Sequence, residues 1–297
     1  MILNQQQYKS RLKRILLTGS NSFIGSGFRK FSENDQIKEV SLIDKAPEEI
    51  DFSEIDVVLH LAALVHQSDR LPEQNYYKIN RDLCLKVAGL AKTAGVKHFV
   101  FMSTVKVYGK FIQGSQPWNE DSVCLPDSTY GKSKYEAELG LQKISDEEFH
   151  VSIVRTPIVY GQEVKANMLK LIKLVRHFSI LPFGNIHNKR CYTYIENLIG
   201  ILDKIIEKNI SGVFIAKDDN SCSTTDLIRF ISKAMDKKMT LISMPHWLIN
   251  GFALIVPLFV ERFYGSLELD NEKTKEILNF QPVYSTAEGI TNMVTSV

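Results

Sequence analysis

The stretch Arg14–Gly25, RILLTGSNSFIG, joins a short apolar run to a turn that contains two glycines. A helix-compatible stretch follows it, and similar apolar runs recur along the chain. Runs that are apolar on both faces and alternate with helical stretches are typical of parallel strands covered on both sides. The sequence therefore predicts a doubly wound α/β core, a Rossmann fold. The further expected strands are 39–44 (EVSLID), 56–63 (DVVLHLAA), 98–104 (HFVFMST), 151–155 (VSIVR) and 212–216 (GVFIA), with helical stretches at 25–31 and around 80–94.

The alternation of strands and helices ends near residue 161, where segments rich in Pro, Asn and aromatic residues begin. We interpret residues 11–161, together with roughly 191–217, as a dinucleotide-binding Rossmann domain. Residues 162–190 and 218–297 would form a smaller substrate-binding lobe. Ligands of such folds bind at the carboxyl ends of the strands, so we expect the lobe to close over that edge of the sheet.

Composition limits the classes of partner. The chain has 44% hydrophobic residues, 24% charged residues and a net charge of +2, which is ordinary for a globular protein and gives no reason to expect nucleic acid. Its four cysteines lie far apart without a C-x-x-C pair. This spacing argues against a metal site and a disulfide framework, and it fits a cytoplasmic location.

One apolar run, Trp247–Val260 (WLINGFALIVPLFV), stands out in the C-terminal third. It is shorter than the roughly 20 residues that span a bilayer, and it contains Pro257. We therefore expect a buried or interface helix, with peripheral membrane docking as the less favoured alternative.

The glycine turn at 18–25 has the context that a dinucleotide fingerprint requires, because it follows a strand and opens a helix. Gly19 would allow the tight turn, and Gly25 would let helix and strand pack closely. The residues between them, which include Phe23 and Ile24, would bring the helix N-terminus to the pyrophosphate. Ser22 stands where such turns have a middle glycine, so its side chain either crowds the diphosphate or hydrogen-bonds to it.

Asp44 is expected to close the second strand, 25 residues after Gly19. An acidic residue there suits the ribose diol of NAD and disfavours NADP, although the neighbouring Lys45 could accept a 2′-phosphate. The segment 44–56 is short, which predicts a stunted third strand. Asp51 and Phe52 at its end are candidates for contact with adenine.

Tyr130 and Lys134 lie four residues apart in YGKSK, so on a helix they share one face. A free tyrosine has a pKa of about 10 and is a poor base at neutral pH. A nearby lysine and a positive nicotinamide ring both stabilise phenolate, which could then take the proton of a sugar hydroxyl. Thr104 ends an expected strand 26 residues before Tyr130 and would place a hydroxyl at the same edge of the sheet.

These motifs together resemble those of extended short-chain dehydrogenases, in the NAD-dependent epimerase/dehydratase family. The resemblance implies that Tyr130 is the acid or base, that Lys134 binds the nicotinamide ribose, and that Thr104 hydrogen-bonds the reacting oxygen. It also implies cofactor contacts from Leu61, Ala62, Ala63, Asn80 and Pro157, substrate contact from Ser103, and a homodimer. The motifs that carry it are TGSNSFIG (18–25), HLAA (60–63), STVKVYG (103–109), YGKSK (130–134), RTPIVYG (155–161) and RCYTYIENL (190–198).

The same resemblance predicts how a nucleotide sugar would be held. Asn167, in VKANML, matches the segment that grips the nucleotide, and Arg190 matches an arginine placed on the diphosphate. Arg262 is a second diphosphate candidate. Arginine suits that position because its planar fork donates two parallel hydrogen bonds.

We therefore expect a 4-epimerase of a UDP-hexose or a UDP-N-acetylhexosamine. A 4-keto reductase that makes a UDP-6-deoxy-N-acetylhexosamine is the alternative, since residues 161–175 (GQEVKANMLKLIKLV), followed by 184–190 (GNIHNKR), resemble a bacterial subgroup that contains such reductases as well as epimerases. A 4,6-dehydratase is disfavoured because Val105-Lys106, not Asp-Glu, follows Thr104. A non-catalytic dinucleotide-binding protein is the alternative from another class, and the presence of both Tyr130 and Lys134 speaks against it.

Overall fold

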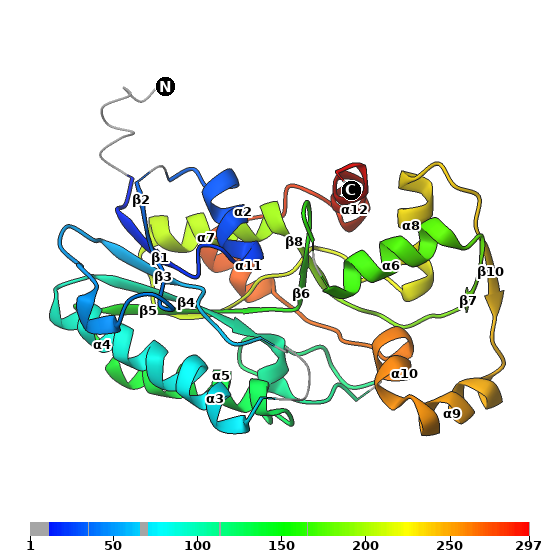
Figure 1. Cartoon of the computed structure of the whole chain (residues 1–297), viewed down its shortest axis with the longest axis horizontal. Coiled ribbons are helices and arrows are strands. Elements are labelled where there is room, and N and C mark those ends of the chain that lie inside the picture. The colour runs from blue at the N-terminus through cyan, green and yellow to red at the C-terminus, as the bar shows by residue number, and fades with distance from the viewer. Residues whose placement is uncertain (1–11, 35, 66–70, 113, 165, 297) are drawn as a thin grey trace.

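The computed structural model describes residues 12–34, 36–65, 71–112, 114–164 and 166–296. Its centre is a parallel sheet of six strands with the order β2-β1-β3-β4-β5-β9 (Figure 1). The predicted doubly wound α/β fold is confirmed. The strands are β1 (Ile15–Thr18), β2 (Ile37–Val40), β3 (Val57–His60), β4 (His98–Thr104), β5 (His150–Thr156) and β9 (Gly212–Ile215).

Helices cover both faces of the sheet because successive strand residues, which point to opposite faces, are apolar. Ile15 and Leu17 of β1 belong to one buried cluster, and Leu16 belongs to the other. The first cluster is completed by α2 (Phe23–Phe31), α7 (Ile195–Lys208) and α11 (Glu272–Leu278). The second is completed by α4 (Cys84–Thr93) and α5 (Thr129–Ile144). A short α3 (Glu73–Tyr77) and a π-helical turn, Lys78–Leu83, lead into α4.

The second strand is shorter than the sequence suggests. β2 ends at Val40, and the amide of Lys45 donates to the carbonyl of Ser41 at 3.2 Å, so residues 41–44 turn instead of extending the strand. Asp44 therefore does not close the strand but lies exposed in the turn beyond it. Between β2 and β3 the chain forms a 3₁₀ turn, Pro47–Glu49, and no strand, in agreement with the prediction that a strand in the segment 44–56 would be stunted.

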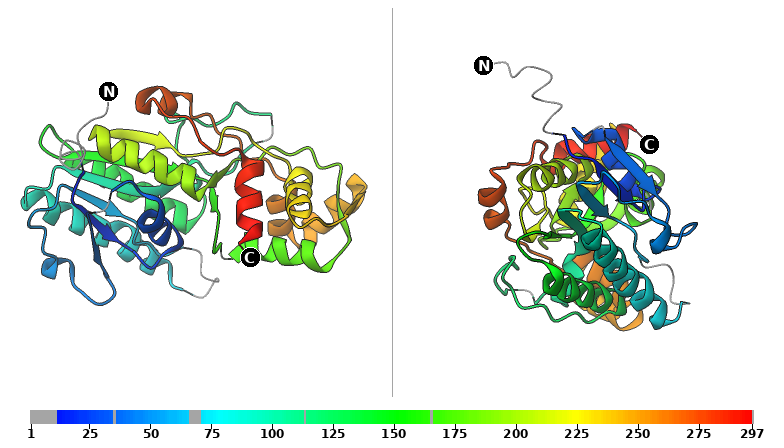
Figure 2. Two further views of the ribbon diagram at one scale, coloured as in Figure 1. Left: turned by 90° about the horizontal axis from the view of Figure 1, so that it is seen from above. Right: turned by 90° about the vertical axis from the view of Figure 1, so that its left-hand side faces the viewer.

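The remaining elements form the lobe beside the sheet, with α12 standing between the two parts (Figure 2). α11 packs against α7 and β9, so part of the segment predicted as lobe lies on the sheet. The domain boundaries themselves stay a prediction. The lobe contains α6 (Ala166–His177), β7 (Ile180–Gly184), α8 (Thr224–Ala234), β10 (Thr240–Ser243), α9 (His246–Ile255), α10 (Pro257–Tyr264) and α12 (Thr286–Thr295), while β6 (Ile158–Tyr160) pairs with β8 (Tyr192–Tyr194).

The apolar run at 247–260 falls on α9 and the start of α10. Trp247, Leu254 and Ile255 are 72%, 88% and 79% exposed, so the expectation of a buried helix is wrong for these side chains. No helix among the described residues is long and apolar enough to cross a membrane.

Candidate active site

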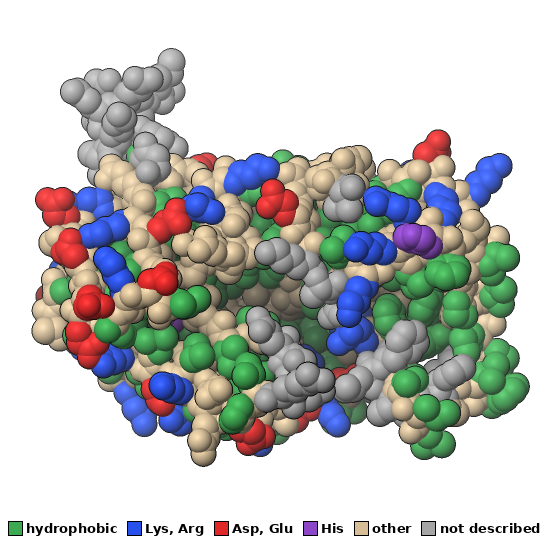
Figure 3. All heavy atoms as spheres, viewed as in Figure 1, with side chains coloured by type: hydrophobic (Ala, Val, Ile, Leu, Met, Phe, Trp, Pro, Cys, Tyr) green, Lys and Arg blue, Asp and Glu red, His purple; other side chains and the backbone are tan. Residues whose placement is uncertain are grey.

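The sheet order reverses between β1 and β3, and ligands of open α/β sheets bind at such a reversal, outside the carboxyl ends of the strands. At this edge Thr18 of β1 is in register with His60 of β3, and Thr104 of β4 with Thr156 of β5. The molecule is hollowed between the sheet and the lobe in the view of Figure 3. Of the predicted site residues, Thr104 lies at this edge at the end of β4, and Leu61 follows β3 there.

Thr104 and Tyr130 meet where β4 ends and α5 begins. Ser128 caps α5 by accepting from the amide of Gly131 at 3.2 Å, which starts the helix just before Tyr130. Burial raises the pKa of Tyr130 to about 12, and a hydrogen bond with the Thr104 side chain opposes that rise. From the sequence we expect Lys134 to lower this pKa, but in the structure the hydrogen bond with Thr104 lowers it. A functional phenolate therefore needs additional positive charge beside the ring.

Lys134 lies one helical turn after Tyr130 and is 2% exposed. Its Nζ lies 3.9 Å from the centre of the Phe101 ring, and burial lowers its pKa to about 8. Within the described part of the chain, no hydrogen bond or ion pair holds this ammonium group. A buried cation without a polar partner is costly, so Lys134 fits a ligand that brings hydroxyl groups, such as the ribose of a dinucleotide.

The glycine turn has the close packing that a dinucleotide turn needs. Gly19 has φ +70°, and a Cβ there would lie 2.8 Å from the amide nitrogen of Ala62. A Cβ on Gly25 would lie 2.6 Å from the carbonyl oxygen of Gly19. Ser22 caps α2, because its hydroxyl accepts from the amide of Gly25 at 3.0 Å. Its side chain thus turns back to the helix, and the amides of Phe23 and Ile24 in the first turn remain for an anion.

Thr18 ties this turn to the end of β3, a role that the sequence argument missed. Its buried Oγ1 accepts from the amides of Leu61 and Ala62, each at 3.2 Å, and lies 3.1 Å from Nδ1 of His60. His60 is fully buried, which lowers its pKa to about 3, and it stacks on Phe99 and Phe101. His60 is therefore a packing residue beneath the glycine turn.

Asn80 fixes the segment that follows β3. Its Oδ1 accepts from the amide of Leu64 at 2.7 Å, and its Nδ2 donates to the carbonyl of Leu64 and to Oγ of Ser133. Asn80 is fully buried, so it acts through the backbone beyond Ala63 and through α5. Pro157 follows β5 and is partly buried at the same edge of the sheet.

The two candidates for contact with adenine, Asp51 and Phe52, differ in exposure. Asp51 is exposed, and its Oδ2 accepts from Nζ of Lys38 at 2.7 Å. This hydrogen bond lowers the pKa of Asp51. Phe52 is buried in the core with Val40 and Val58, so only its backbone is available to a ligand.

Ser103 contacts a buried ion pair between α5 and β5. Its hydroxyl donates to Oε1 of Glu138, and Nη2 of Arg155 lies 2.6 Å from Oε2 of the same carboxylate. Nη1 of Arg155 also donates to the hydroxyl of Tyr108 at 3.0 Å. The pair joins α5 to β4 and β5 directly behind Thr104 and Tyr130. A charged residue within the apolar run VSIVR is the signal in the sequence that could have indicated it.

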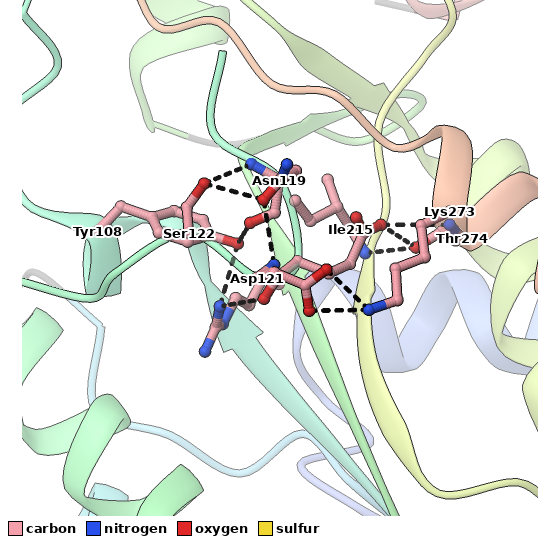
Figure 4. Close-up of polar contacts among 9 residues, drawn as sticks. Tyr108, Asn119, Asp121, Ser122, Ile215, Lys273 and Thr274 are labelled. Carbon is pink, nitrogen blue, oxygen red and sulfur yellow. Dashed lines mark hydrogen bonds and ion pairs between the residues drawn. The ribbon is translucent and has the colours of Figure 1, made fainter. Parts of the chain in front are cut away.

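The network continues into the C-terminal segment. The Tyr108 hydroxyl donates to the carbonyl of Asn119 at 2.7 Å, and the buried Glu120 accepts from the Thr274 hydroxyl at 2.5 Å. Figure 4 shows Lys273 and Thr274 pointing toward the loop at 119–122, where Lys273 pairs with Asp121 at 2.7 Å. These contacts fasten α11 to the loop that follows Tyr108.

The two arginines that are predicted to hold the diphosphate lie close together on the lobe. Nη1 of Arg190 donates to the carbonyl of Glu261 at 3.2 Å and to that of Gly265 at 2.9 Å, which places it at the end of α10 beside Arg262. Arg262 is exposed on that helix. Asn167 lies in α6, but its side chain is outside the described part of the structure.

Comparison with known proteins agrees with this architecture. A model of the NAD dependent epimerase/dehydratase family matches residues 15–214. The chain belongs to this family. It is 32% identical over 305 residues to a UDP-glucose 4-epimerase of Vibrio cholerae, covering 93% of each chain. The chain is therefore an enzyme of an NAD(P)-dependent family, and both the predicted family and the predicted fold class are confirmed.

Two solved structures are similar throughout. One is UDP-glucuronic acid 4-epimerase from Bacillus cereus in complex with NAD, at a TM-score of 0.74 and 21% identity, covering 95% of this chain and 97% of that one. The other is dTDP-4-dehydrorhamnose reductase from Bacillus anthracis in complex with NADP, at a TM-score of 0.74 and 20% identity, covering 96% and 100%. At such identities these matches establish the fold alone.

Proposed function

We propose that this chain is a NAD-dependent 4-epimerase of a UDP-hexose or a UDP-N-acetylhexosamine that acts by transient oxidation at C4. The observation that carries the proposal is the contact between Thr104 and Tyr130 one helical turn before the buried Lys134. The relative from Vibrio cholerae, named as a UDP-glucose 4-epimerase, supports the reaction type.

In this proposal Tyr130 takes the proton of the 4-hydroxyl and later returns it to the same oxygen, while the Thr104 hydroxyl hydrogen-bonds that oxygen. Lys134 donates to the ribose hydroxyls of the cofactor, and its charge favours phenolate at Tyr130. Bound NAD supplies the acceptor and later the donor of the C4 hydride, together with the positive ring that the raised pKa of Tyr130 calls for. Arg190 and Arg262 hold the substrate diphosphate.

The preference for NAD rests on Asp44. Although β2 stops at Val40, Asp44 is exposed in the turn that follows it, where its carboxylate can meet the adenosine ribose. A carboxylate there repels a 2′-phosphate. The family match favours neither NAD nor NADP, and a homodimer likewise stays a prediction.

The first test replaces Tyr130 by Phe. We expect the variant to keep its fold and to bind NAD, but to lose about 10²–10⁴ in turnover, as is typical when an acid-base group is removed. Unchanged turnover of the natural substrate would show that Tyr130 is not the acid-base group.

The second test separates the epimerase from the 4-keto reductase, which the same three residues could also serve. NMR would follow the interconversion of UDP-GlcNAc with UDP-GalNAc, and of UDP-Glc with UDP-Gal, without added cofactor. A UDP-4-keto-6-deoxy-GlcNAc substrate would then be offered with NADH or NADPH. Interconversion of either pair supports the epimerase. Stoichiometric consumption of reduced cofactor with the keto sugar, without interconversion of either pair, would show that the chain is a 4-keto reductase and not an epimerase.

A further inference from the structure

The lobe turns an apolar helix face to solvent. On α9, Trp247, Gly251, Leu254 and Ile255 follow the spacing i, i+4, i+7, i+8, so they share one side of the helix. All four are exposed, and Leu254 reaches 88%. A helix of a globular protein normally turns such a stripe toward the core, so this side of α9 fits a contact outside the chain.

The two-stranded sheet of β7 and β10, of which β10 directly precedes α9 in the chain, also exposes apolar side chains. Ile180 of β7 is in register with Thr240 of β10, and the register shifts between Leu241 and Ser243. Ile180 and Ile242 are both exposed, whereas Leu181 next to Ile180 is buried. The two isoleucines are 60% and 52% exposed, and the adjacent Phe178 is 55% exposed. Figure 3 shows hydrophobic side chains gathered over β7, β10 and α9. We refer to Phe178, Ile180, Ile242, Trp247, Leu254 and Ile255 as the apolar face.

Basic residues border the apolar face. Residues 162–190 and 222–264 contain 11 Lys and Arg against 4 Asp and Glu, although the whole chain has a net charge of only +2. Lys237 donates to the carbonyls of Arg176 and Phe178 at 2.7 and 2.9 Å, which brings Arg176 and the exposed Lys238 next to the apolar face. In Figure 3 Lys and Arg gather over α6 and α8, beside the hydrophobic side chains.

We propose that the apolar face docks on the surface of an anionic lipid bilayer. Its side chains enter the boundary between headgroups and acyl chains, where the amphipathic ring of Trp247 is well suited. Arg176, Lys237 and Lys238 attract the anionic headgroups. A second copy of the chain is a poorer occupant, because a two-fold interface sets the same patch against itself and would bring two basic borders together. The proposal does not depend on which sugar reaction the site performs.

Tryptophan fluorescence gives a direct test. The chain has two tryptophans, and Trp118 packs against the rings of Tyr108 and Phe111 at 5.1 and 5.2 Å. In a Trp118→Phe variant the exposed Trp247 is the only reporter. Vesicles that mix phosphatidylcholine with phosphatidylglycerol should shift its emission to shorter wavelength, and brominated lipid should quench it. Phosphatidylcholine alone should have a much weaker effect, and salt should reverse the shift.

Vesicle sedimentation then identifies the residues. Trp247→Ser combined with Leu254→Ser should weaken partitioning at least tenfold, and Arg176→Glu combined with Lys238→Glu should weaken it on anionic vesicles. Val283→Ser, at a side chain that is 74% exposed between α11 and α12, is the matched control and should bind like the wild type. Circular dichroism checks that each variant is folded.

Three results would overturn the proposal. The first is an emission spectrum of Trp247 that anionic vesicles leave unchanged. The second is undiminished partitioning of the double serine variant. The third is a dimer in solution that the double serine variant dissociates while neither protein binds vesicles, which would assign the apolar face to a second copy of the chain.

Discussion

The buried ion pair between Glu138 and Arg155 offers the sharpest test of how this site is built. The exposed fractions of the two side chains are 1% and 5%, and two guanidinium nitrogens of Arg155 donate to the carboxylate at 2.6 and 3.2 Å. We consider Glu138→Gln, which keeps the shape of the side chain and its bond from Ser103 but removes the charge. Arg155 would then remain charged and buried without a counter-ion.

Removing one partner of a buried ion pair costs about 3–5 kcal/mol, because the remaining charge is uncompensated. We expect Glu138→Gln to lower the free energy of unfolding by that amount. Glu136→Gln is the matched control on the same helix. Glu136 pairs with Arg81 at 2.6 Å, but the two side chains are 42% and 34% exposed. An ion pair in water contributes at most about 1 kcal/mol, so this control should be almost silent.

Urea unfolding, followed by circular dichroism and by tryptophan fluorescence, would measure both variants. Coincident transitions from the two probes would justify a two-state analysis. A double variant, Glu138→Met with Arg155→Met, completes a thermodynamic cycle. It should be less destabilised than the sum of the two single variants, because neither charge is left unpaired. A loss for Glu138→Gln no larger than that for Glu136→Gln, or strict additivity in the cycle, would refute the reasoning.

Three further predictions follow from the site. Lys134 has a pKa of about 8 in the folded protein against an ordinary value of 10.5, so at a pH between these values folding releases its proton, and the free energy of unfolding should rise from pH 8 to 10. Urea titrations of the cofactor-free protein should show this rise in the wild type and not in Lys134→Met. A difference in unfolding free energy between the two proteins that does not change with pH would contradict the prediction. Calorimetry should show that NAD binds at least tenfold more tightly than NADP, a difference of about 1.4 kcal/mol in binding free energy, and that Asp44→Asn reduces this difference. A preference for NADP would show that Asp44 does not select NAD. Gly25→Ala should lower the free energy of unfolding by about 1–3 kcal/mol and weaken NAD binding, because the new Cβ would lie 2.6 and 2.7 Å from two backbone oxygens. Gly89→Ala is the control: no atom lies within 4 Å of its Cβ position, so this substitution should be neutral or stabilising.

The sequence was sufficient to predict the sheet and the shared helix face of Tyr130 and Lys134, because both depend on local patterns. Runs such as HFVFMST are apolar on both faces and became β4 without any change of bounds. Tyr130 and Lys134 lie on the same helix, as their spacing predicts, because Ser128 caps α5 and the helix begins at Thr129. Capping chemistry of this kind can be recognised from a few neighbouring residues.

Features that depend on tertiary packing could not be predicted. EVSLID has the composition of a strand, yet β2 stops at Val40, since the turn closed by Ser41 and Lys45 replaces further extension. Hydropathy identifies the apolar run at 247–260, but it does not predict which other elements pack on it. In the structure Trp247 and Leu254 are exposed. Ser22 was a candidate for the diphosphate, whereas in the structure its hydroxyl caps α2.

The residues of the YGKSK motif differ from the residues that hold α5 in position against β4 and β5. Thr104 and Tyr130 come from β4 and α5, and only contacts between those two elements bring the two hydroxyl groups together. Glu138 lies two helical turns after Tyr130, so the bond that it accepts from Ser103 and its pairing with Arg155 fix α5 against β4 and β5. A variant that keeps the whole YGKSK motif but loses Glu138 should accordingly keep the chemistry of Tyr130 and lose its alignment. Its turnover should fall. Because the charge of Glu138 also raises the pKa of Lys134, the pH dependence is compared in Ser103→Ala, which leaves that charge in place. In this variant turnover should fall while its pH dependence stays that of the wild type, and this separates a positioning residue from a catalytic one.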